Sequence, residues 1–348
     1  MSGGDRPFIP EGSDTSPVPD AGHGHAGDDR VLPFAIEGLD VRGRVVRLGS
    51  AVDRILGRHK YPPSVSRVLG EATALTVLLG ASLKLDGRFQ LQTRSDGPID
   101  MIVVDFDAPD RVRACARFDA GRLEQAAAEH ALDTGALLGN GHLAMTIDQG
   151  SEASRYQGIV ALEGQNLEDA AHHYFSQSEQ IPTRIRLAVG EEVVPGEAGG
   201  HFRAGALMVQ FMPKAQDRLR RPDLPPGDAP EGAADAPAPD GEDDGWTEAR
   251  MLVDTTEDHE LIDPTVSSEG LLFRLFHERG VRVFAAQEVH EACQCSRERI
   301  MSMLTRFSAQ ERSDMVGDDG RIGVTCEFCS RHYDLDPVEV EREVAASR

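Results

Sequence analysis

Apolar residues follow two different rhythms along the chain from about Val31 onward. Between Ser64 and Leu83 they recur every three or four positions, as in a helix that buries one face, and alanines among them favour close packing on a sheet. Shorter alternating or wholly apolar runs are typical of strands, which we expect at 39–48, 88–93, 100–106, 112–118, 141–147, 156–162 and 183–189. Because no helix regularly separates these strands, the pattern predicts an α+β domain of mixed sheet and helix over residues 31–213.

Two local signals refine this domain. Asn166 is a typical N-cap, so a helix is expected from there to about Ser176, and Ile181-Pro182 would stop it. Cys115 falls within the alternating run 112–118. A thiol in that setting is expected to be a small core residue rather than a reactive group.

Two stretches lack the apolar residues that a core requires. Residues 1–30 are rich in Gly, Pro, Asp and Ser, and we expect a disordered tail in which His23 and His25 are solvated. Pro222–Gly245 holds six prolines and eight acidic residues but no Lys or Arg. Such a segment cannot bury enough apolar surface to offset its ordering entropy. It is expected to be a disordered insert within a linker region of residues 214–285.

The rest of this linker region has a helical pattern. Order is expected to resume near Trp246, the only tryptophan. Ser268 is expected to cap a helix that carries leucine and phenylalanine pairs four residues apart and ends at Gly280.

Four of the five cysteines lie in the last 60 residues, as Cys293-Gln-Cys295 and Cys326-Glu-Phe-Cys329. Two close thiol pairs separated by a short helical stretch can surround one tetrahedral ion, and four sulfur ligands at about 2.3 Å suit Zn²⁺. The sequence therefore predicts one Zn²⁺ held by Cys293, Cys295, Cys326 and Cys329.

The residues around these cysteines predict a compact module over residues 286–348. Short strands at 321–326 and 330–335 flank the second pair, so that a tight turn between them would direct both sulfurs to one point. Ser296 is expected to cap a helix that runs to about Phe307, and Asp336 with Pro337 is expected to open a final helix.

A zinc ion in such a module can have either a structural or a redox role. A module of about 60 residues has a small core, and metal binding then supplies its folding free energy. Coordination also keeps the sulfurs as thiolates, which are the oxidisable form. Thiols two and three residues apart can each close a local disulfide. Their oxidation would remove ligands, release the zinc and unfold the module.

Other metal ligands and catalytic motifs have little support in the sequence. His290 and His332 lie near the cysteines, but four cysteines already complete the tetrahedron. A thioredoxin-like role for Cys326 and Cys329 would place the motif at a helix N-terminus, whereas here it lies between strands. No Gly-rich phosphate loop, HExxH or GxSxG motif occurs, so we expect no catalytic residues and no enzymatic activity.

Composition and charge limit the partners and the compartment. A chain of 348 residues with 40% apolar residues is long enough for two globular domains. A net charge of −23 argues against nucleic acid binding. No run reaches the ~20 apolar residues of a membrane helix, and the first thirty residues contain no signal-peptide h-region. We therefore expect no membrane association and a cytoplasmic location, where clustered cysteines bind metal or sense redox state.

Several further motifs accompany the cysteines. Cys293-Gln-Cys295-Ser-Arg-Glu-Arg and Cys326-Glu-Phe-Cys329 are followed by His332-Tyr333. Upstream motifs are Tyr61-Pro-Pro, Ser95-Asp-Gly-Pro98, Gly139-Asn-Gly141, Arg155-Tyr-Gln-Gly158, Tyr174-Phe-Ser-Gln-Ser-Glu-Gln-Ile-Pro-Thr183 and Gly205–Pro213. Together they resemble the 33 kDa chaperonin family, the redox-regulated heat-shock holdases of bacteria. The tail at 1–30 and the acidic insert depart from the family pattern.

The resemblance implies an ATP-independent chaperone that binds unfolding proteins, with a reduced, zinc-bound form that is inactive. In the family, peroxide at raised temperature or hypochlorite forms disulfides within each cysteine pair, which here would be Cys293–Cys295 and Cys326–Cys329. Zinc then leaves, the module and the adjoining linker unfold, and apolar surface is exposed to clients. Active family members are homodimers. No local motif marks the client-binding residues of this chain.

Two alternative functions remain. The zinc-stapled module could be a constitutive protein-docking adaptor, or Cys326 and Cys329 could serve a thiol–disulfide oxidoreductase. Zinc release on oxidation would separate the chaperone from the adaptor, and turnover in an insulin-reduction assay would support the enzyme.

Overall fold

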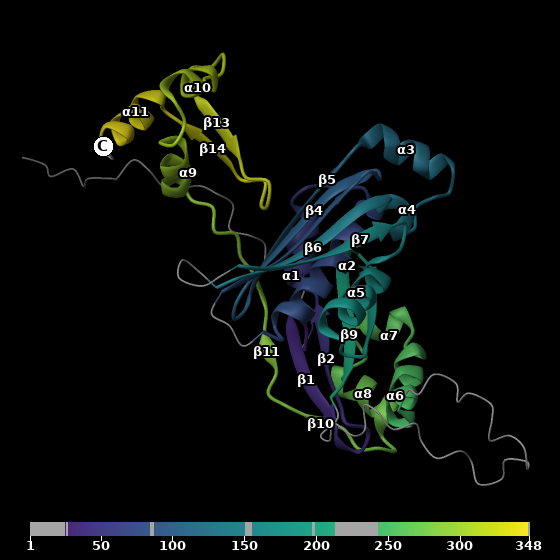
Figure 1. The fold of residues 1–348 in the computed structure, drawn as a ribbon. Coiled ribbons are helices and arrows are strands. Elements are labelled where there is room, and N and C mark those ends of the chain that lie inside the picture. The colour runs from purple at the N-terminus through teal and green to yellow at the C-terminus, as the bar shows by residue number, and fades with distance from the viewer. Residues whose placement is uncertain are drawn as a thin grey trace, which may run out of the picture.

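The computed structural model describes His25 and residues 27–83, 87–149, 155–196, 199–212 and 243–346. These residues form two sheets, helices between and around the sheets, and a small unit at the C-terminal end (Figure 1). The predicted α+β class is therefore confirmed.

Sheet A is antiparallel, with strand order β10-β1-β2-β9-β8 and with β11 also paired to β1. Its long strands and short edge strands are β1 (Arg30–Ile36), β2 (Val41–Leu48), β8 (Thr183–Val193), β9 (Gly200–Phe211), β10 (Arg282–Val283) and β11 (Gln287–Glu288). The strand predicted at 39–48 begins at Val41, because Glu37–Leu39 forms the 3-10 turn η1 and Asp40 has a left-handed backbone.

Sheet B has the order β12-β5-β4-β3-β6-β7 and is antiparallel apart from the β12–β5 pair. It consists of β3 (Arg88–Ser95), β4 (Ile99–Asp107), β5 (Arg111–Phe118), β6 (Asn140–Asp148), β7 (Tyr156–Glu163) and β12 (His290–Glu291). The two-residue strand β12 comes just before Cys293, so it joins the C-terminal unit to the edge of this sheet.

Helix α2 (Pro63–Gly80) lies between the two sheets and contacts strands of both. The sequence predicted this helix with one buried face, but almost every residue from Val65 to Gly80 is buried. Two glycines allow the close approach: a Cβ on Gly70 would lie 3.0 Å from Val189 of β8, and one on Gly80 would lie 2.6 Å from Phe106 of β4. The main core is therefore shared by α2 and both sheets.

The opposite face of sheet A is covered by α6 (Asp244–Asp254), α7 (Asp258–Ile262) and α8 (Ser268–Phe276), shown in green in Figure 1. Their apolar residues form a second core with the sheet, in which Trp246 lies near Phe211 and Phe276 near Phe34. The predicted pairs within α8 are buried there. Its cap is Ser267 rather than Ser268, and it ends at Phe276 rather than at Gly280.

The described residues up to Glu291, which contain both sheets, are called the body. Its shorter helices are α1 (Ser50–Gly57), α3 (Ala120–Ala128), α4 (Thr134–Leu138), α5 (Leu167–Tyr174) and the π-helical turn η2 (Phe175–Glu179). Asn166 caps α5 as predicted, accepting a hydrogen bond from the Asp169 amide at 2.8 Å. Helices α1, α3 and α4 were not predicted; they have only eight, nine and five residues, too few for a clear helical periodicity.

The predicted tail is too long at its C-terminal end. Asp28 forms a bidentate ion pair with Arg203 of β9, at 2.6 and 2.7 Å, and both side chains are 5% exposed. Asp29 accepts hydrogen bonds from the amides of Gly49 and Ala51 and so caps α1. These carboxylates belong to the fold because they neutralise a buried guanidinium and satisfy a helix end. His25 also contacts Glu192 at 3.0 Å, while His23 lies outside the described residues.

The predicted disordered insert, Pro222–Gly245, is wrong at its last three residues. Asp243 caps α6 by accepting hydrogen bonds from the amides of Gly245 and Trp246, at 2.9 and 3.3 Å. Asp243, one of the eight acidic residues on which the prediction of disorder rested, is thus a helix cap. The remainder of the insert lies outside the described residues.

The C-terminal unit contains α9 (Arg297–Leu304), α10 (Ala309–Asp314), the hairpin of β13 (Ile322–Thr325) and β14 (His332–Leu335), and α11 (Pro337–Ala346). Its buried apolar residues are few: Ile300, Leu304, Ile322, Leu335, Val340 and Val344. Helix α9 ends three residues before the predicted Phe307, and α10, with its Ser308–Glu311 capping box, was not predicted.

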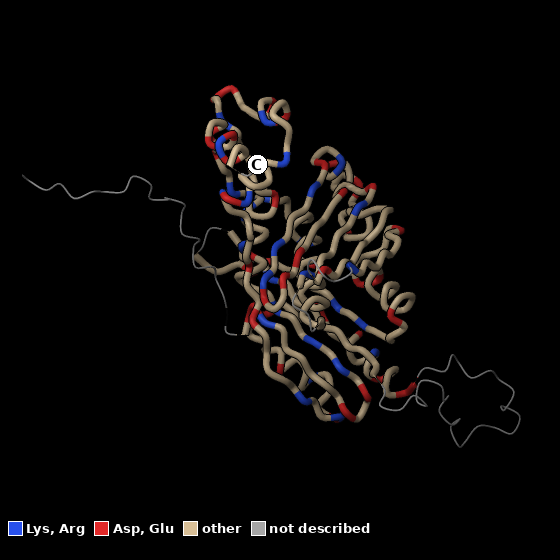
Figure 2. The backbone as a smooth tube through the Cα atoms, turned by 60° about the vertical axis from the view of Figure 1, so that its left-hand side comes forward, with Lys and Arg blue, Asp and Glu red and all other residues tan. Residues whose placement is uncertain are grey.

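The described surface carries charges of both signs. Figure 2 shows acidic and basic residues interspersed along the body and the C-terminal unit. None of the described helices combines the length and the apolar character needed to cross a membrane.

Candidate metal centre

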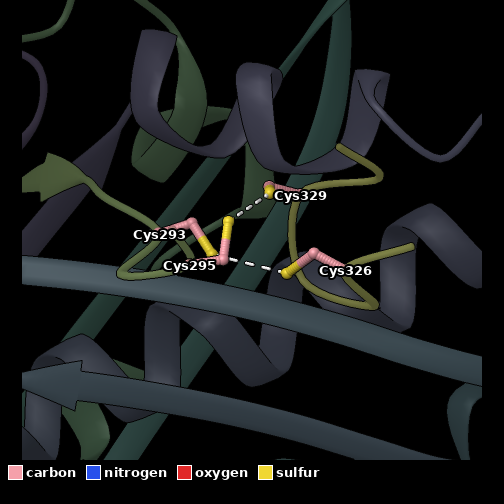
Figure 3. A group of neighbouring side chains, drawn as sticks. All are labelled: Cys293, Cys295, Cys326 and Cys329. Atoms are coloured by element: carbon pink, nitrogen blue, oxygen red, sulfur yellow. Dashed lines mark hydrogen bonds between the residues drawn. The ribbon is translucent and has the colours of Figure 1, made fainter. Parts of the chain in front are cut away.

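Four sulfurs meet between two segments of the C-terminal unit (Figure 3). Cys293 and Cys295 lie between β12 and α9, and Cys326 and Cys329 lie on the turn between β13 and β14. The Sγ atoms of Cys293 and Cys326 are 3.6 Å apart, those of Cys295 and Cys329 are 3.2 Å apart, and all four lie within 4.8 Å of one another. A tetrahedral ion with sulfur bonds of about 2.3 Å needs separations of about 3.8 Å, so the cluster fits such an ion after small shifts.

The backbone explains why these sulfurs converge. On the hairpin turn, the amide of Cys326 donates to the carbonyl of Arg331 at 2.9 Å, and the amide of Ser330 donates back to Cys326 at 2.8 Å. Ser330 completes the turn with a φ of +55°. In the other segment, Ser296 caps α9 directly after Cys295, as the sequence predicted. Each cysteine pair is therefore held by local structure that its own flanking residues specify.

Hydrogen bonds set the acidity of the cluster. Burial raises the pKa of Cys295, but hydrogen bonds from the Tyr333 hydroxyl, at 3.2 Å, and from the other cysteines lower it to about 7. Burial and the neighbouring thiolates raise the pKa of Cys293 and of Cys329. The pKa of Tyr333 is raised to about 12, by burial and by its bond to Cys295, so it remains a donor. In the absence of metal, one thiolate thus forms near neutral pH and opposes the next ionisation.

The histidines considered as substitutes do not join the cluster. His332 contacts Thr325 Oγ1 through Nδ1 at 2.8 Å and Asp334 through Nε2 at 3.0 Å. His290 is largely exposed beside Glu288. Among the described residues, the four cysteines are the only set of His, Cys, Asp or Glu side chains with metal-binding spacing.

The fifth cysteine lies in the core of the body. Cys115 on β5 is 4% exposed, and burial raises its pKa to about 12. Its thiol is therefore protonated and inaccessible at neutral pH. This confirms the prediction of a small core residue.

The metal loop, defined as Cys326–Ser330, docks on the body. The guanidinium of Arg113 on β5 lies 4.1 Å from the centre of the Phe328 ring. His59, after α1, contacts the carbonyl of Phe328 at 3.1 Å and the hydroxyl of Ser330 at 2.9 Å. Neither contact could be read from the sequence, because each joins residues more than 200 positions apart.

The segment that leads into the first cysteine pair is also tied to the body. Arg58 forms a bidentate ion pair with Glu291 of β12, and Gln294 donates to Asp107 of β4 at 2.7 Å. The body therefore contacts the chain on both sides of Cys293.

Helix α7 is held on sheet A by two buried arginines. Arg47 of β2 donates to the carbonyls of Glu260 and Asp263, at 2.6 and 2.8 Å, and Arg203 donates to that of Ile262 at 2.6 Å. The carbonyls of Glu260 and Ile262 lie in the last turn of the helix, and Asp263 is its C-cap residue. The arginines thus cap α7 from the sheet, a contact that no local pattern in the sequence predicts.

Comparisons with known proteins agree with this arrangement. A family model described as "Hsp33 protein" matches residues 29–336. A 33 kDa chaperonin of Caulobacter vibrioides (strain NA1000 / CB15N) is 45% identical over 313 residues, covering 89% of this chain and 95% of that protein. A 33 kDa chaperonin of Photobacterium profundum is 30% identical over 313 residues, covering 90% of this chain and 94% of that protein.

A solved structure shares the fold. The crystal structure of the 33 kDa chaperonin (Heat shock protein 33 homolog) of Thermotoga maritima matches with a TM-score of 0.69 at 20% sequence identity. The match covers 92% of this chain and 99% of that one. The family model, the relatives and the fold lead to one conclusion: this chain belongs to the Hsp33 family.

Proposed function

We propose that this protein is an ATP-independent holdase chaperone that oxidation switches on. In the reduced state Cys293, Cys295, Cys326 and Cys329 hold one Zn²⁺, and the protein is inactive. Oxidation forms the disulfides Cys293–Cys295 and Cys326–Cys329, the zinc leaves, and the protein binds unfolding clients. It acts in the cytoplasm as a homodimer and by binding rather than catalysis. The observation that carries the proposal is the four-sulfur cluster in a chain of the Hsp33 family.

The chemistry of the donor set supports zinc. Thiolate ligands in a tetrahedral arrangement are typical of structural Zn²⁺, and the small core of the unit leaves much of its stability to the metal. When bound, the ion would hold the sulfurs as thiolates and join the two segments.

Oxidation within each pair would separate the segments. Two thiolates and one hydrogen peroxide give one disulfide and two hydroxide ions: a sulfur attacks one peroxide oxygen, the O–O bond breaks, and a second thiolate displaces hydroxide from the resulting S–OH. In the structure, sulfurs of different segments are in contact, Cys293 with Cys326 at 3.6 Å and Cys295 with Cys329 at 3.2 Å. Disulfides inside each pair remove these links, whereas disulfides between the segments would keep the unit closed.

The contacts of the body suggest how this change could uncover apolar surface. The metal loop and β12 dock on the same edge of sheet B, and the chain between α8 and β12 runs along β1 as β10 and β11. Unfolding of the C-terminal unit would loosen the pairing of β10 and β11 with β1, and then the packing of helices α6–α8 on sheet A. The face of sheet A beneath them carries buried apolar side chains that could bind clients: Leu32, Phe34, Val45, Leu207, Val209 and Phe211.

The test measures zinc, thiols and client aggregation together, before and after peroxide treatment at mildly raised temperature. We expect one zinc to be released with the loss of four thiols, while the treated protein gains the ability to suppress aggregation of an unfolding client. Retained zinc with no gain in activity would refute the switch and favour the docking adaptor.

Peptide mapping identifies the disulfides in the same samples. Trypsin should release residues 283–297, with Cys293 and Cys295, and residues 322–331, with Cys326 and Cys329. Disulfides within the pairs leave two separate peptides, each lighter by two hydrogens. Peptides linked to each other would contradict the proposed pairing.

A further inference from the structure

We propose that Tyr333 slows the oxidation of the switch by donating its hydroxyl hydrogen to Cys295. The inference rests on the proposed redox function and adds a residue that sets the threshold of that switch. Tyr333 is a positioning residue here, since it would act on the oxidant only through the sulfur that it contacts.

The hydrogen bond connects the two halves of the cluster. Tyr333 lies on β14, opposite Val324 of β13, so its position is fixed by the hairpin that carries Cys326 and Cys329. Its hydroxyl donates to Cys295 Sγ at 3.2 Å, across to the other segment.

The effect on oxidation follows from the role of the sulfur lone pair. A thiolate reacts with peroxide by directing a lone pair at one oxygen, after which hydroxide leaves and a second thiolate completes the disulfide. A hydrogen bond to an ionised acceptor is among the stronger kinds. The hydrogen bond occupies a lone pair of the sulfur. The nucleophilicity of a thiolate also falls as the thiolate is stabilised, with a Brønsted slope of about 0.4–0.5. Cys295 should therefore react more slowly while Tyr333 holds it.

A structural role alone would give a different pattern. If Tyr333 only packed against the hairpin, a phenylalanine of nearly the same shape would leave the rates unchanged. Because the proposed effect depends on the strength of the donor, removing the hydroxyl and strengthening it should change the rate in opposite directions.

The experiment compares the reduced, zinc-loaded full chain with Tyr333→Phe and with 3-fluorotyrosine at position 333, a stronger donor of similar size. Two rates are measured at one pH: alkylation of Cys295 by iodoacetamide, followed by peptide mass spectrometry, and zinc release by hydrogen peroxide, followed with a chelating dye. We expect both to be about three- to tenfold faster in Tyr333→Phe and slower in the fluorotyrosine protein. Tyr156→Phe, on the far edge strand β7, is the matched control and should have the rates of the wild type.

Unchanged or reversed rates in both Tyr333 variants, at full zinc content, would overturn the inference. If Tyr333→Phe fails to hold zinc before oxidant is added, the fluorotyrosine protein decides alone, because it retains both the ring and the hydroxyl. The alkylation rates also separate this inference from the proposed function. A wild-type protein that keeps its zinc under peroxide refutes the switch, whereas equal alkylation rates refute the role of Tyr333.

Discussion

The ring of Phe328, in the middle of the Cys326–Cys329 turn, packs against the guanidinium of Arg113 on the body, 4.1 Å from the ring centre. The two residues are 215 positions apart (328 − 113), yet they place the metal loop directly on strand β5. Arg113 is itself held by Asp105, which is 1% exposed and 2.6 Å away. A change in the metal loop therefore alters the surroundings of Arg113, which a buried carboxylate of the body holds in place.

Phe328→Ala should release the metal loop from the body without removing a metal ligand. A cation–π contact of this kind contributes about 0.5–2 kcal/mol. We expect faster hydrogen exchange at the amides of His290 and Ala292, which bond the carbonyls of Asp110 and Val112 in the reduced protein. The exchange should rise about two- to tenfold while bound zinc is unchanged.

Phe284→Ala is the control for this change. Phe284 also lies beside an arginine, with Arg282 at 5.3 Å, but it is 45% exposed and belongs to the path along sheet A. It should leave the exchange of His290 and Ala292 as in the wild type. Equal exchange in all three proteins would show that the Phe328 contact does not hold the loop.

Cys293→Ser should weaken metal binding even under reducing conditions. A serine hydroxyl is a poor zinc ligand at neutral pH, and the six buried apolar residues of the unit cannot replace the lost binding energy. We expect at least about tenfold weaker zinc retention against a chelator, and rapid proteolysis of the C-terminal unit. Cys115→Ala, in the body core, should retain the zinc. A Cys293→Ser protein with full zinc and normal protease resistance would refute the four-ligand assignment.

The sequence predicted the parts of this protein that depend on neighbouring residues. Helix α2, the caps Asn166 and Ser296, and the strands around Cys326 follow from periodicity and capping chemistry that act within a few residues. The convergence of the four cysteines was also predictable, because each pair lies in one short segment. That they bind zinc remains a prediction.

Contacts between distant residues could not be predicted. Nothing local marks Arg47 as the partner of the Asp263 carbonyl, or Asp28 as the partner of Arg203. Asp28 instead counted towards disorder, because an acidic residue looks the same in a solvated tail and in a buried ion pair. Strand β12 has two residues, too few for any periodicity, although it joins the unit to sheet B.

Gly205→Ala should push α7 away from sheet A. A Cβ at position 205 on β9 would lie 2.4 Å from the carbonyl oxygen of Leu261 and 2.8 Å from its Cβ. Overpacking of this kind costs about 1–3 kcal/mol, and the short helix can relieve it by moving. We expect faster hydrogen exchange in α7, more binding of an apolar dye, and partial suppression of client aggregation without oxidant.

Gly57→Ala, at the end of α1, is the control because a Cβ there meets no atom within 4 Å. It should resemble the wild type in all three measurements. If Gly205→Ala loosens α7 but the reduced protein gains no client binding, the face beneath α6–α8 is not the client surface.

Arg47→Lys should weaken the cap on α7 while keeping the positive charge. The guanidinium donates to two carbonyls at once, whereas the shorter lysine side chain ends in an ammonium group that can form a good hydrogen bond to only one of them. The side chain is 4% exposed, so the lost hydrogen bond should cost about 1–2 kcal/mol in the free energy of unfolding. Denaturant unfolding measures this loss. Arg274→Lys, at the partly exposed pair with Glu260, should cost less than about 1 kcal/mol, and equal losses would argue against the cap.

Glu71, on α2, gives a pH dependence of defined sign. Burial raises the pKa of its carboxyl from 4.5 to about 7, although a hydrogen bond from Thr134 and the charge of Arg67 lower it in part. Glu168 and Asp258 also face this carboxyl and raise its pKa further. The folded state therefore keeps a proton that the unfolded chain has lost between about pH 4.5 and 7. Stability contributed by this group falls as the pH rises through that window.

Glu71→Gln should remove this loss, because a neutral amide needs no proton and its oxygen can still accept the hydrogen bond from Thr134. We expect the variant to match the wild type near pH 4.5 and to be more stable at about pH 8 by about 1–2 kcal/mol, a value reduced from the full pKa shift because Glu71 itself is only partly buried. Thermal unfolding at both pH values measures the difference. Glu124→Gln, on the exposed face of α3, should change stability little at either pH. A Glu71→Gln advantage of equal size at the acidic and the alkaline pH would show that the effect is packing and not ionisation.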